Sequence, residues 1–326
     1  MENYYNHLNS YLKNKFGERT LKICIDGGFT CPNRDGQVGI GGCVFCSEKG
    51  SGELIKTFPS IEEQINNYLN SYKAKRANKF IVYFQNFTNT YDTIKNLKEK
   101  YDSSLIDKRI VGIDIATRPD CINEDICKLL SSYTNKYDVT VELGLQTSDD
   151  KIGNIINRCY KSSKFTEAVL LLRKYNINVV AHIMCGLPGE DRTKYFKYIK
   201  ENQLPDYFYN ENLVPDSIKD TVNFINKHDL QGIKIHSTYV VKNTILENIY
   251  NEKKYIPLFY EEYMNDLLYI ISHINPKLII HRICGDAPKD ILIAPEWNAH
   301  KKIILNNIDK FLKSNNLYQG KFFSEQ

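Results

Sequence analysis

The stretch CPNRDGQVGIGGCVFC, residues 31–46, carries three cysteines, Cys31, Cys43 and Cys46, at the spacing C-x11-C-x2-C. It follows an apolar segment, residues 21–25, that predicts a β-strand. Four glycines lie between the first two of these cysteines, at positions 36, 39, 41 and 42. Glycines at this density let the backbone turn tightly and approach a bound group closely. We therefore expect a loop that leaves the end of a strand and presents three thiols to one ligand.

Thiolates are soft ligands that suit zinc or iron–sulfur clusters. A closed structural zinc site has four protein ligands, and no fourth Cys or His follows at a short, regular spacing. Three cysteines can hold a four-iron cluster through three of its irons, which leaves the fourth iron open to a further ligand. Two alternatives stay open: a zinc site completed by a distant ligand, and three buried cysteines that serve as small apolar side chains.

Strands and helices alternate along the rest of the chain. Six Val- and Ile-rich strands are predicted, over residues 21–25, 79–85, 110–117, 139–147, 178–185 and 232–239. Helices are predicted over residues 1–16, 60–75, 91–101, 124–133, 150–156, 165–174, 258–273 and 298–314, with a further strand at 278–283. This alternation predicts an α/β fold with a parallel sheet, either a (β/α) barrel or a flavodoxin-like open sheet.

Charge and composition place only weak constraints on the partner and the cellular compartment of the protein. The 43 Lys and Arg residues against 39 Asp and Glu give a net charge of +4, which permits an anionic partner without requiring one. Nine cysteines without an apparent signal peptide indicate a reducing compartment. No apolar run approaches the length of a membrane span, so we expect a cytoplasmic protein with no membrane partner.

Polar side chains inside otherwise apolar strands are the candidate site residues. Glu142, Gly144 and Gln146 share one face of their predicted strand, opposite an apolar face. Lys234 and His236 alternate with isoleucines in the same way, which suggests substrate binding or proton transfer; protection of an edge strand by the lysine is the alternative. Asp114, inside its predicted strand, is a further polar candidate, as are Gln85, Thr88 and Arg118 near strand ends.

With these motifs in place, the chain resembles the radical SAM superfamily, in which three cysteines ligate a [4Fe-4S] cluster and S-adenosylmethionine (SAM) binds its fourth iron. The likeness is to the bacterial YtqA/YhcC-type branch related to the elongator catalytic subunit. The gap between Cys31 and Cys43 is longer than the usual C-x3-C, as in that branch, and the usual Gly-Gly-Glu is missing near Gln85. The resemblance implies a partial (β/α)6 barrel over residues 18–245, preceded by an N-terminal helix over 1–17 and followed by a C-terminal α/β extension over 246–326.

The same resemblance implies roles for individual residues. Cys31, Cys43 and Cys46 would ligate the cluster. SAM would be bound by Phe45, Gln85, Thr88, Asp114, Glu142 at the ribose, Gln146, Arg158 at the methionine carboxylate, and Gly186 and Leu187 in the turn Gly-Leu-Pro-Gly-Glu. Lys234 and His236 would be catalytic, and the substrate would meet Arg118, Arg282, Asp286 and Trp297.

The function implied is reductive cleavage of SAM to a 5′-deoxyadenosyl radical that abstracts hydrogen from a substrate. Kinship with the elongator subunit implies a tRNA partner and conversion of a wobble-uridine carboxymethylaminomethyl group to aminomethyl, with electrons from a flavodoxin- or ferredoxin-type donor. A small-molecule substrate, as in the coproporphyrinogen dehydrogenase relatives, and a zinc-stabilised nucleic-acid-binding module are the alternatives. Residues 191–215 look like an insertion that serves as a lid or a partner surface.

Overall fold

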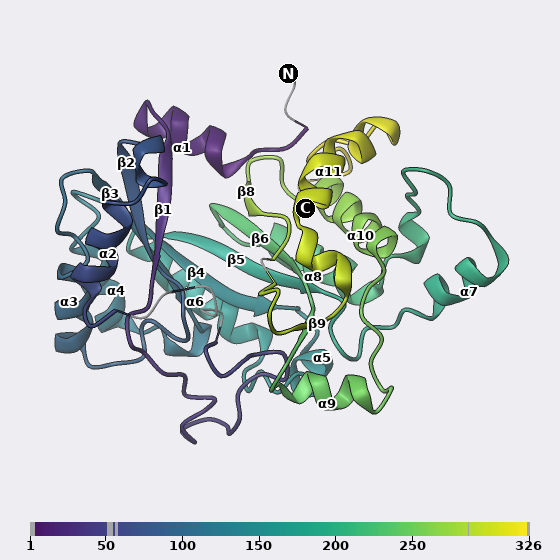
Figure 1. The fold of residues 1–326 in the computed structure, drawn as a ribbon, viewed down its shortest axis with the longest axis horizontal. Helices are drawn as coiled ribbons and strands as arrows, with labels where there is room; N and C mark the ends of the chain where they lie inside the picture. The colour runs from purple at the N-terminus through teal and green to yellow at the C-terminus, as the bar shows by residue number, and fades with distance from the viewer. Residues whose placement is uncertain (1–3, 51–54, 56–57, 286, 325–326) are drawn as a thin grey trace.

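A computed structural model describes residues 4–50, 55, 58–285 and 287–324. Seven parallel strands form one curled sheet whose neighbours follow chain order (Figure 1). The strands are β1 (Thr20–Ile25), β2 (Lys79–Phe84), β3 (Ile110–Thr117), β4 (Asp138–Gln146), β5 (Asn178–Cys185), β6 (Gly232–Ser237) and β8 (Ile279–Arg282). A flavodoxin-like sheet reverses its strand order around the first strand. The sequential order observed here is that of a barrel, so the predicted partial barrel is confirmed.

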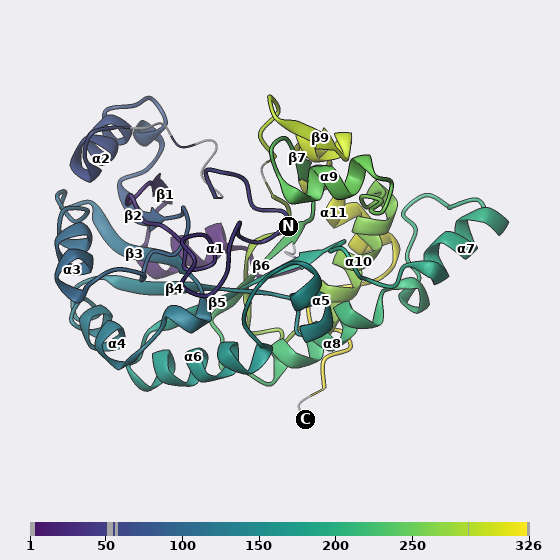
Figure 2. The ribbon, with the colours of Figure 1, turned by 90° about the horizontal axis from the view of Figure 1, so that it is seen from below.

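Helices cover the convex side of this sheet (Figure 2). Those on this side include α3 (Ile94–Asp102), α4 (Glu124–Ser131), α6 (Ser162–Lys174) and α8 (Asp216–Asn226). The other helices before residue 252 are α1 (Leu8–Phe16), α2 (Ile61–Leu69), α5 (Asp150–Ile155), α7 (Thr193–Glu201) and α9 (Ile245–Asn251). Side chains at their N-caps define several starts: Ser60, Thr93 and Asn123 each accept a hydrogen bond from a backbone N–H in the first turn. None of the described helices is long and apolar enough to cross a membrane.

The alternation of side chains along each strand separates a core from a site. Ile113, Ile115, Val141 and Leu143 face the helices and are fully buried in the main hydrophobic cluster. The intervening residues, such as Glu142, face the concave side of the sheet. The predicted two faces of the fourth strand are therefore confirmed, and the polar faces meet inside the half-barrel.

The C-terminal region adds a strand to the main sheet. β8 pairs with β6, with Gly232 opposite Ile279 and Lys234 opposite Arg282, so the sheet has seven strands where the sequence predicted six in the barrel. β6 is consequently an internal strand, which removes edge protection as the reason for Lys234. Helices α10 (Tyr260–His273) and α11 (Lys302–Ser314) pack beside β8, and their apolar side chains join the same core cluster.

A second, two-stranded sheet lies beside the cysteine loop. β7 (Val240–Val241) pairs antiparallel with β9 (Leu292–Ala294). The N–H of Leu246, in α9, donates to the carbonyl of Val44 at 2.8 Å, which ties this unit to the loop. The sequence missed this sheet because strands of two and three residues are too short to show a period.

Several predicted helix ends differ from those observed. The N-terminal helix begins at Leu8 because His7 is held in extended backbone beside Ile280, whose N–H donates to the carbonyl of Asn6. The second helix ends at Leu69, and a short 3-10 helix, η1 (Ala74–Arg76), follows it. The other 3-10 helices are η2 (Pro119–Cys121), η3 (Glu211–Leu213) and η4 (Glu296–His300), the last of which replaces the predicted start of the final helix.

Candidate active site

The cysteine loop is held in shape by its own hydrogen bonds. Asn33 is fully buried and donates through Nδ2 to the carbonyl of Asn157 at 2.6 Å, with Cys43 Sγ at 3.8 Å. Arg34 donates to the carbonyls of Cys46, at 3.0 Å, and of Ser47. Gly42 adopts φ +80°, and a Cβ there would lie 3.0 Å from Arg34 Nε. The glycine is thus needed for both conformation and space.

Cys31, Cys43 and Cys46 all line one cavity of about 880 Å³ on the concave side of the sheet. Burial raises the pKa of the Cys43 thiol to about 12, so the sulfur is protonated until a metal displaces the proton. Within the described ranges, no three His, Cys, Asp or Glu side chains are grouped to hold one metal ion. Cluster ligands bind separate irons, so three thiols lining one large cavity fit a cluster.

The wall opposite the loop carries a buried network of charges. Lys22 pairs with Asp114 and, at 3.1 Å, with Glu142. Lys234 also pairs with Glu142 and donates to Tyr83 Oη at 3.0 Å. Burial lowers the pKa of Lys234 to about 8. Burial opposes the charge on Glu142, but Lys234 and Lys22 outweigh it and hold the pKa of this carboxyl well below its usual range.

Two histidines lie beside this network. The rings of His182 and His236 have centroids 4.4 Å apart in an edge-to-face arrangement, and both side chains line the cavity. Burial lowers the pKa of His182 to about 3 and that of His236 well below its ordinary value. Both imidazoles are therefore neutral. Their buried Nε2 atoms have no hydrogen-bond partner among the described residues.

Most of the residues singled out in the sequence converge on this cavity. Besides the three cysteines, the lining includes Phe45, Gln85, Thr88, Arg118, Glu142, Gln146, Lys234, His236 and Arg282. Asp114 is buried and pairs with the cavity residue Lys22. Asp286 lies outside the described residues.

The structure does not bring Arg158 to the cavity. Its side chain is fully buried and donates to the carbonyls of Leu145 at 2.6 Å and Thr147 at 2.5 Å, and it pairs with Asp150 at 2.8 Å. The guanidinium thus holds the turn between β4 and α5. Arg34 and Arg118 are the arginines beside the cysteines that line the cavity.

Three other predicted contacts also lie away from the cavity lining. Trp297 Nε1 donates to the carbonyl of Leu258 at 2.9 Å, and the indole stacks on Tyr263. Its surroundings are those of the packed core, not of a surface where it would stack on a substrate base. Gly186 accepts through its carbonyl from Tyr255 Oη, and Leu187 packs in a small cluster with Val44.

Sequence reasoning missed several lining residues. Lys22 and Cys24 alternate with the buried Ile23 and Ile25 on β1, a pattern that predicts a polar inner face. Tyr83 and His182 are single polar groups in apolar strands, which periodicity does not distinguish from core residues. Residues 191–215, by contrast, contribute none of the described lining, and α7 projects from the side of the molecule (Figures 1 and 2).

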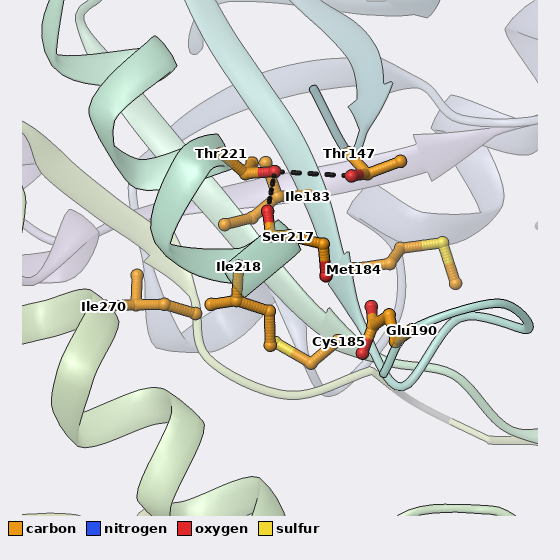
Figure 3. A pocket seen from close by; sticks show the side chains of 9 residues that line it. All are labelled: Thr147, Ile183, Met184, Cys185, Glu190, Ser217, Ile218, Thr221 and Ile270. Carbon is orange, nitrogen blue, oxygen red and sulfur yellow. Dashed lines mark hydrogen bonds between the residues drawn. The ribbon is translucent and has the colours of Figure 1, made fainter. Parts of the chain in front are cut away.

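A second cavity, of about 10 Å³, lies next to β5 under α8 and is lined by Thr147, Cys185, Glu190, Ser217 and Thr221 among others (Figure 3). This volume holds about one water molecule. It is too small for a substrate.

Comparison with known proteins identifies the family. A model described as the radical SAM superfamily matches residues 31–200, the segment from Cys31, the first of the three loop cysteines, into α7. The chain belongs to the radical SAM superfamily. A second model, described as the radical SAM C-terminal domain, matches residues 230–314.

Similar proteins cover nearly the whole chain. Uncharacterized protein YtqA of Bacillus subtilis is 37% identical over 99% of this chain and 94% of its own length. Protein YhcC of Escherichia coli is 30% identical over 92% of this chain and 90% of its own. A tRNA uridine(34) acetyltransferase of Dehalococcoides mccartyi is 32% identical over 55% of this chain and 34% of its own. Elp3 of Methanocaldococcus infernus superposes with a TM-score of 0.61 at 17% identity, covering 92% of this chain and 64% of that one.

Membership of this superfamily implies a [4Fe-4S] cluster and SAM as cofactors. Cys31, Cys43 and Cys46 would hold the cluster, and the cavity that they line has the volume that small-molecule sites require.

Proposed function

We propose that this radical SAM enzyme modifies the wobble uridine of tRNA, by converting a carboxymethylaminomethyl group to aminomethyl. The observation that carries the proposal is the lining of the cavity. Among the described residues it holds six basic side chains against one acidic side chain, Glu142, together with aromatic rings. Basic groups suit phosphates, and aromatic rings suit bases. The partial similarity to tRNA uridine(34) acetyltransferases points to the same substrate.

When bound, the cluster and SAM supply a hydrogen-abstracting radical by reductive cleavage of SAM. The conversion balances if the substrate CH2 between nitrogen and carboxylate loses one hydrogen atom to the deoxyadenosyl group and one electron. Water then hydrolyses the oxidised C–N bond. The products are the primary amine, glyoxylate, methionine, 5′-deoxyadenosine and a proton. The substrate would thus lose two electrons in all, one with the hydrogen atom and one on its own. The second would offset the electron used to cleave SAM, so a flavodoxin- or ferredoxin-type donor would be needed only to prime the enzyme.

The chain's own residues have three tasks in this reaction. Hydrolysis of the oxidised C–N bond requires proton transfer, for which Lys234, with its pKa near 8 and its contact to Tyr83, is suited. Glu142 keeps the lysine in place through its ion pair. The half-barrel and the cysteine loop enclose the reacting carbon and limit side reactions with water.

The first test is reconstitution with iron and sulfide, followed by dithionite, SAM and an anticodon stem-loop RNA that carries carboxymethylaminomethyluridine. We expect 5′-deoxyadenosine, aminomethyluridine and glyoxylate in equal amounts. Cys43→Ala removes one proposed cluster ligand and should abolish all three, whereas Cys127→Ala, at a buried cysteine outside the cavity lining, should retain them. Deoxyadenosine without either RNA product would leave the superfamily chemistry intact and refute the tRNA substrate.

A further inference from the structure

Positive charge predominates at the inner end of the cavity. Among the described residues, the lining at this end has Lys22, Lys234 and Arg282, with Glu142 as its acidic side chain. Glu142 and the neighbouring Asp114 already pair with lysines. A wall of this sign favours an anionic ligand over a neutral or cationic one.

The cations and histidines form a row across neighbouring strands. On β5, β6 and β8, His182 lies opposite Lys234, and Lys234 lies opposite Arg282. His236, two residues after Lys234 on β6, shares its face of the strand. All four side chains line the cavity. The row is therefore a continuous strip of nitrogen-bearing groups along one wall.

Two nitrogen atoms on the strip that lack a partner in the described part of the chain are available to hydrogen-bond a ligand. The Nε2 atoms of His182 and His236 are buried and lack a hydrogen-bond partner among the described residues. Buried polar atoms in folded proteins are nearly always hydrogen-bonded. A neutral imidazole can donate one hydrogen bond, and a guanidinium binds a carboxylate with two. The donors and the positive wall together match a monoanion with two oxygens.

We propose that His182, Lys234, Arg282 and His236 form a carboxylate-binding subsite for the substrate. The identity of the carboxylate, a carboxymethyl group on nitrogen, rests on the proposed function. The row lies within the strands, whereas the cysteine loop leaves the carboxyl end of β1. A substituent anchored at the row therefore passes through the cavity toward the thiols, and the carbon next to its carboxylate is held deep in the site.

The subsite can be tested without tRNA. N-benzylglycine has a ring, CH2, NH and carboxymethyl group in the order found on the modified uridine, and N-benzylglycinamide lacks only the charge. We expect the reconstituted enzyme with SAM to bind the acid at least about tenfold more tightly than the amide, the range for a hydrogen bond to a charged group. Arg282→Gln and His236→Gln should each remove this preference.

Lys277→Gln is the matched control, because this exposed lysine precedes β8 and lies outside the cavity lining. It should keep the preference of the native enzyme. Equal binding of acid and amide by the native enzyme, or an unchanged preference in both cavity variants, overturns the subsite. The KM for SAM should stay within about twofold in the variants. A parallel rise would assign the row to the carboxylate of SAM and overturn the proposal too.

The outcomes separate this inference from the proposed function. If the enzyme prefers the acid but does not convert the RNA, the carboxylate subsite is supported and the tRNA substrate is refuted. If the enzyme converts the RNA but binds the acid and the amide equally, the tRNA substrate is supported and the carboxylate subsite is refuted. If both hold, the cavity variants should lower kcat/KM for the RNA at least about tenfold.

Discussion

Glu142 is the residue on which the buried charge network depends. Its side chain is 3% exposed and pairs with both Lys22 and Lys234. Glu142→Gln keeps the shape and leaves two buried ammonium groups without their shared counterion. We expect a loss of about 3–5 kcal/mol in the free energy of unfolding, measured with urea. Glu252→Gln, in an exposed pair with Lys254, should change it by less than about 0.5 kcal/mol. Equally small losses of unfolding free energy in the two variants would contradict the stabilising role of the buried charge network.

The site residues that sequence reasoning located share one property. Glu142, Gln146, Lys234 and His236 interrupt apolar strands at alternate positions, so the period of two is enough to assign each of them to a face of its strand. For Arg158, by contrast, the sequence did not predict where the side chain lies. Two of its carbonyl partners, Leu145 and Thr147, lie where β4 ends, on either side of Gln146 with φ +58°. No residue spacing in the sequence predicts this backbone conformation.

Helix α10 is buried on all sides, and two of its carboxylate residues, Glu262 and Asp266, differ in whether they have a partner among the residues described. Every residue from Glu262 to Ser272 is buried. Glu262 pairs with Arg192, whose Nε donates to it at 2.7 Å. Asp266 has no hydrogen-bond partner among the described residues, and burial raises its pKa well above the ordinary value. Glu262 therefore has a cationic partner, whereas Asp266 is held neutral.

Two variants of α10 should therefore have opposite effects. Because the folded pKa of Asp266 lies above its unfolded value near 3.8, its contribution to stability is present below that pH and is lost as pH rises. Asp266→Asn should gain about 1–3 kcal/mol over the native protein at pH 8 and little at pH 4. Glu262→Gln should lose about 3 kcal/mol at pH 8, since it leaves Arg192 buried and unpaired. Urea denaturation at both pH values decides this, and a loss in Asp266→Asn at pH 8 would show that its carboxylate has a partner.

Among the elements, strands were predicted better than their connections. The strands are runs of β-branched residues, and burial on both faces preserves that composition in the sequence. Where α2 ends, and how η4 precedes α11, depends on contacts with distant segments that local spacing does not encode. The segment around α7 shows the same limit, since Arg192 fixes its start through Glu262, 70 residues away.

At the scale of the molecule, the half-barrel leaves its concave face for the cofactors and gives its convex face to the core. That core does not divide at residue 245, where the sequence predicts a domain boundary. β8 completes the sheet beside β6, and side chains of α10 and α11 belong to the same hydrophobic cluster as those of β1 to β6. The predicted core and extension are therefore expected to fold as one unit.

A chain that ends at residue 245 tests this expectation. It would lack β8, α10 and α11, turn β6 into an open edge, and expose apolar residues such as Ile233 and Ile235, which are fully buried in the intact protein. We expect the fragment to be insoluble or to lack a cooperative unfolding transition, and co-expression of residues 246–326 to restore a soluble complex. The whole chain, studied as the apoprotein, should unfold in a single transition followed by circular dichroism and fluorescence together. A soluble 1–245 fragment that unfolds cooperatively would mean that the barrel is stable without its seventh strand, and that the extension is a separate domain after all.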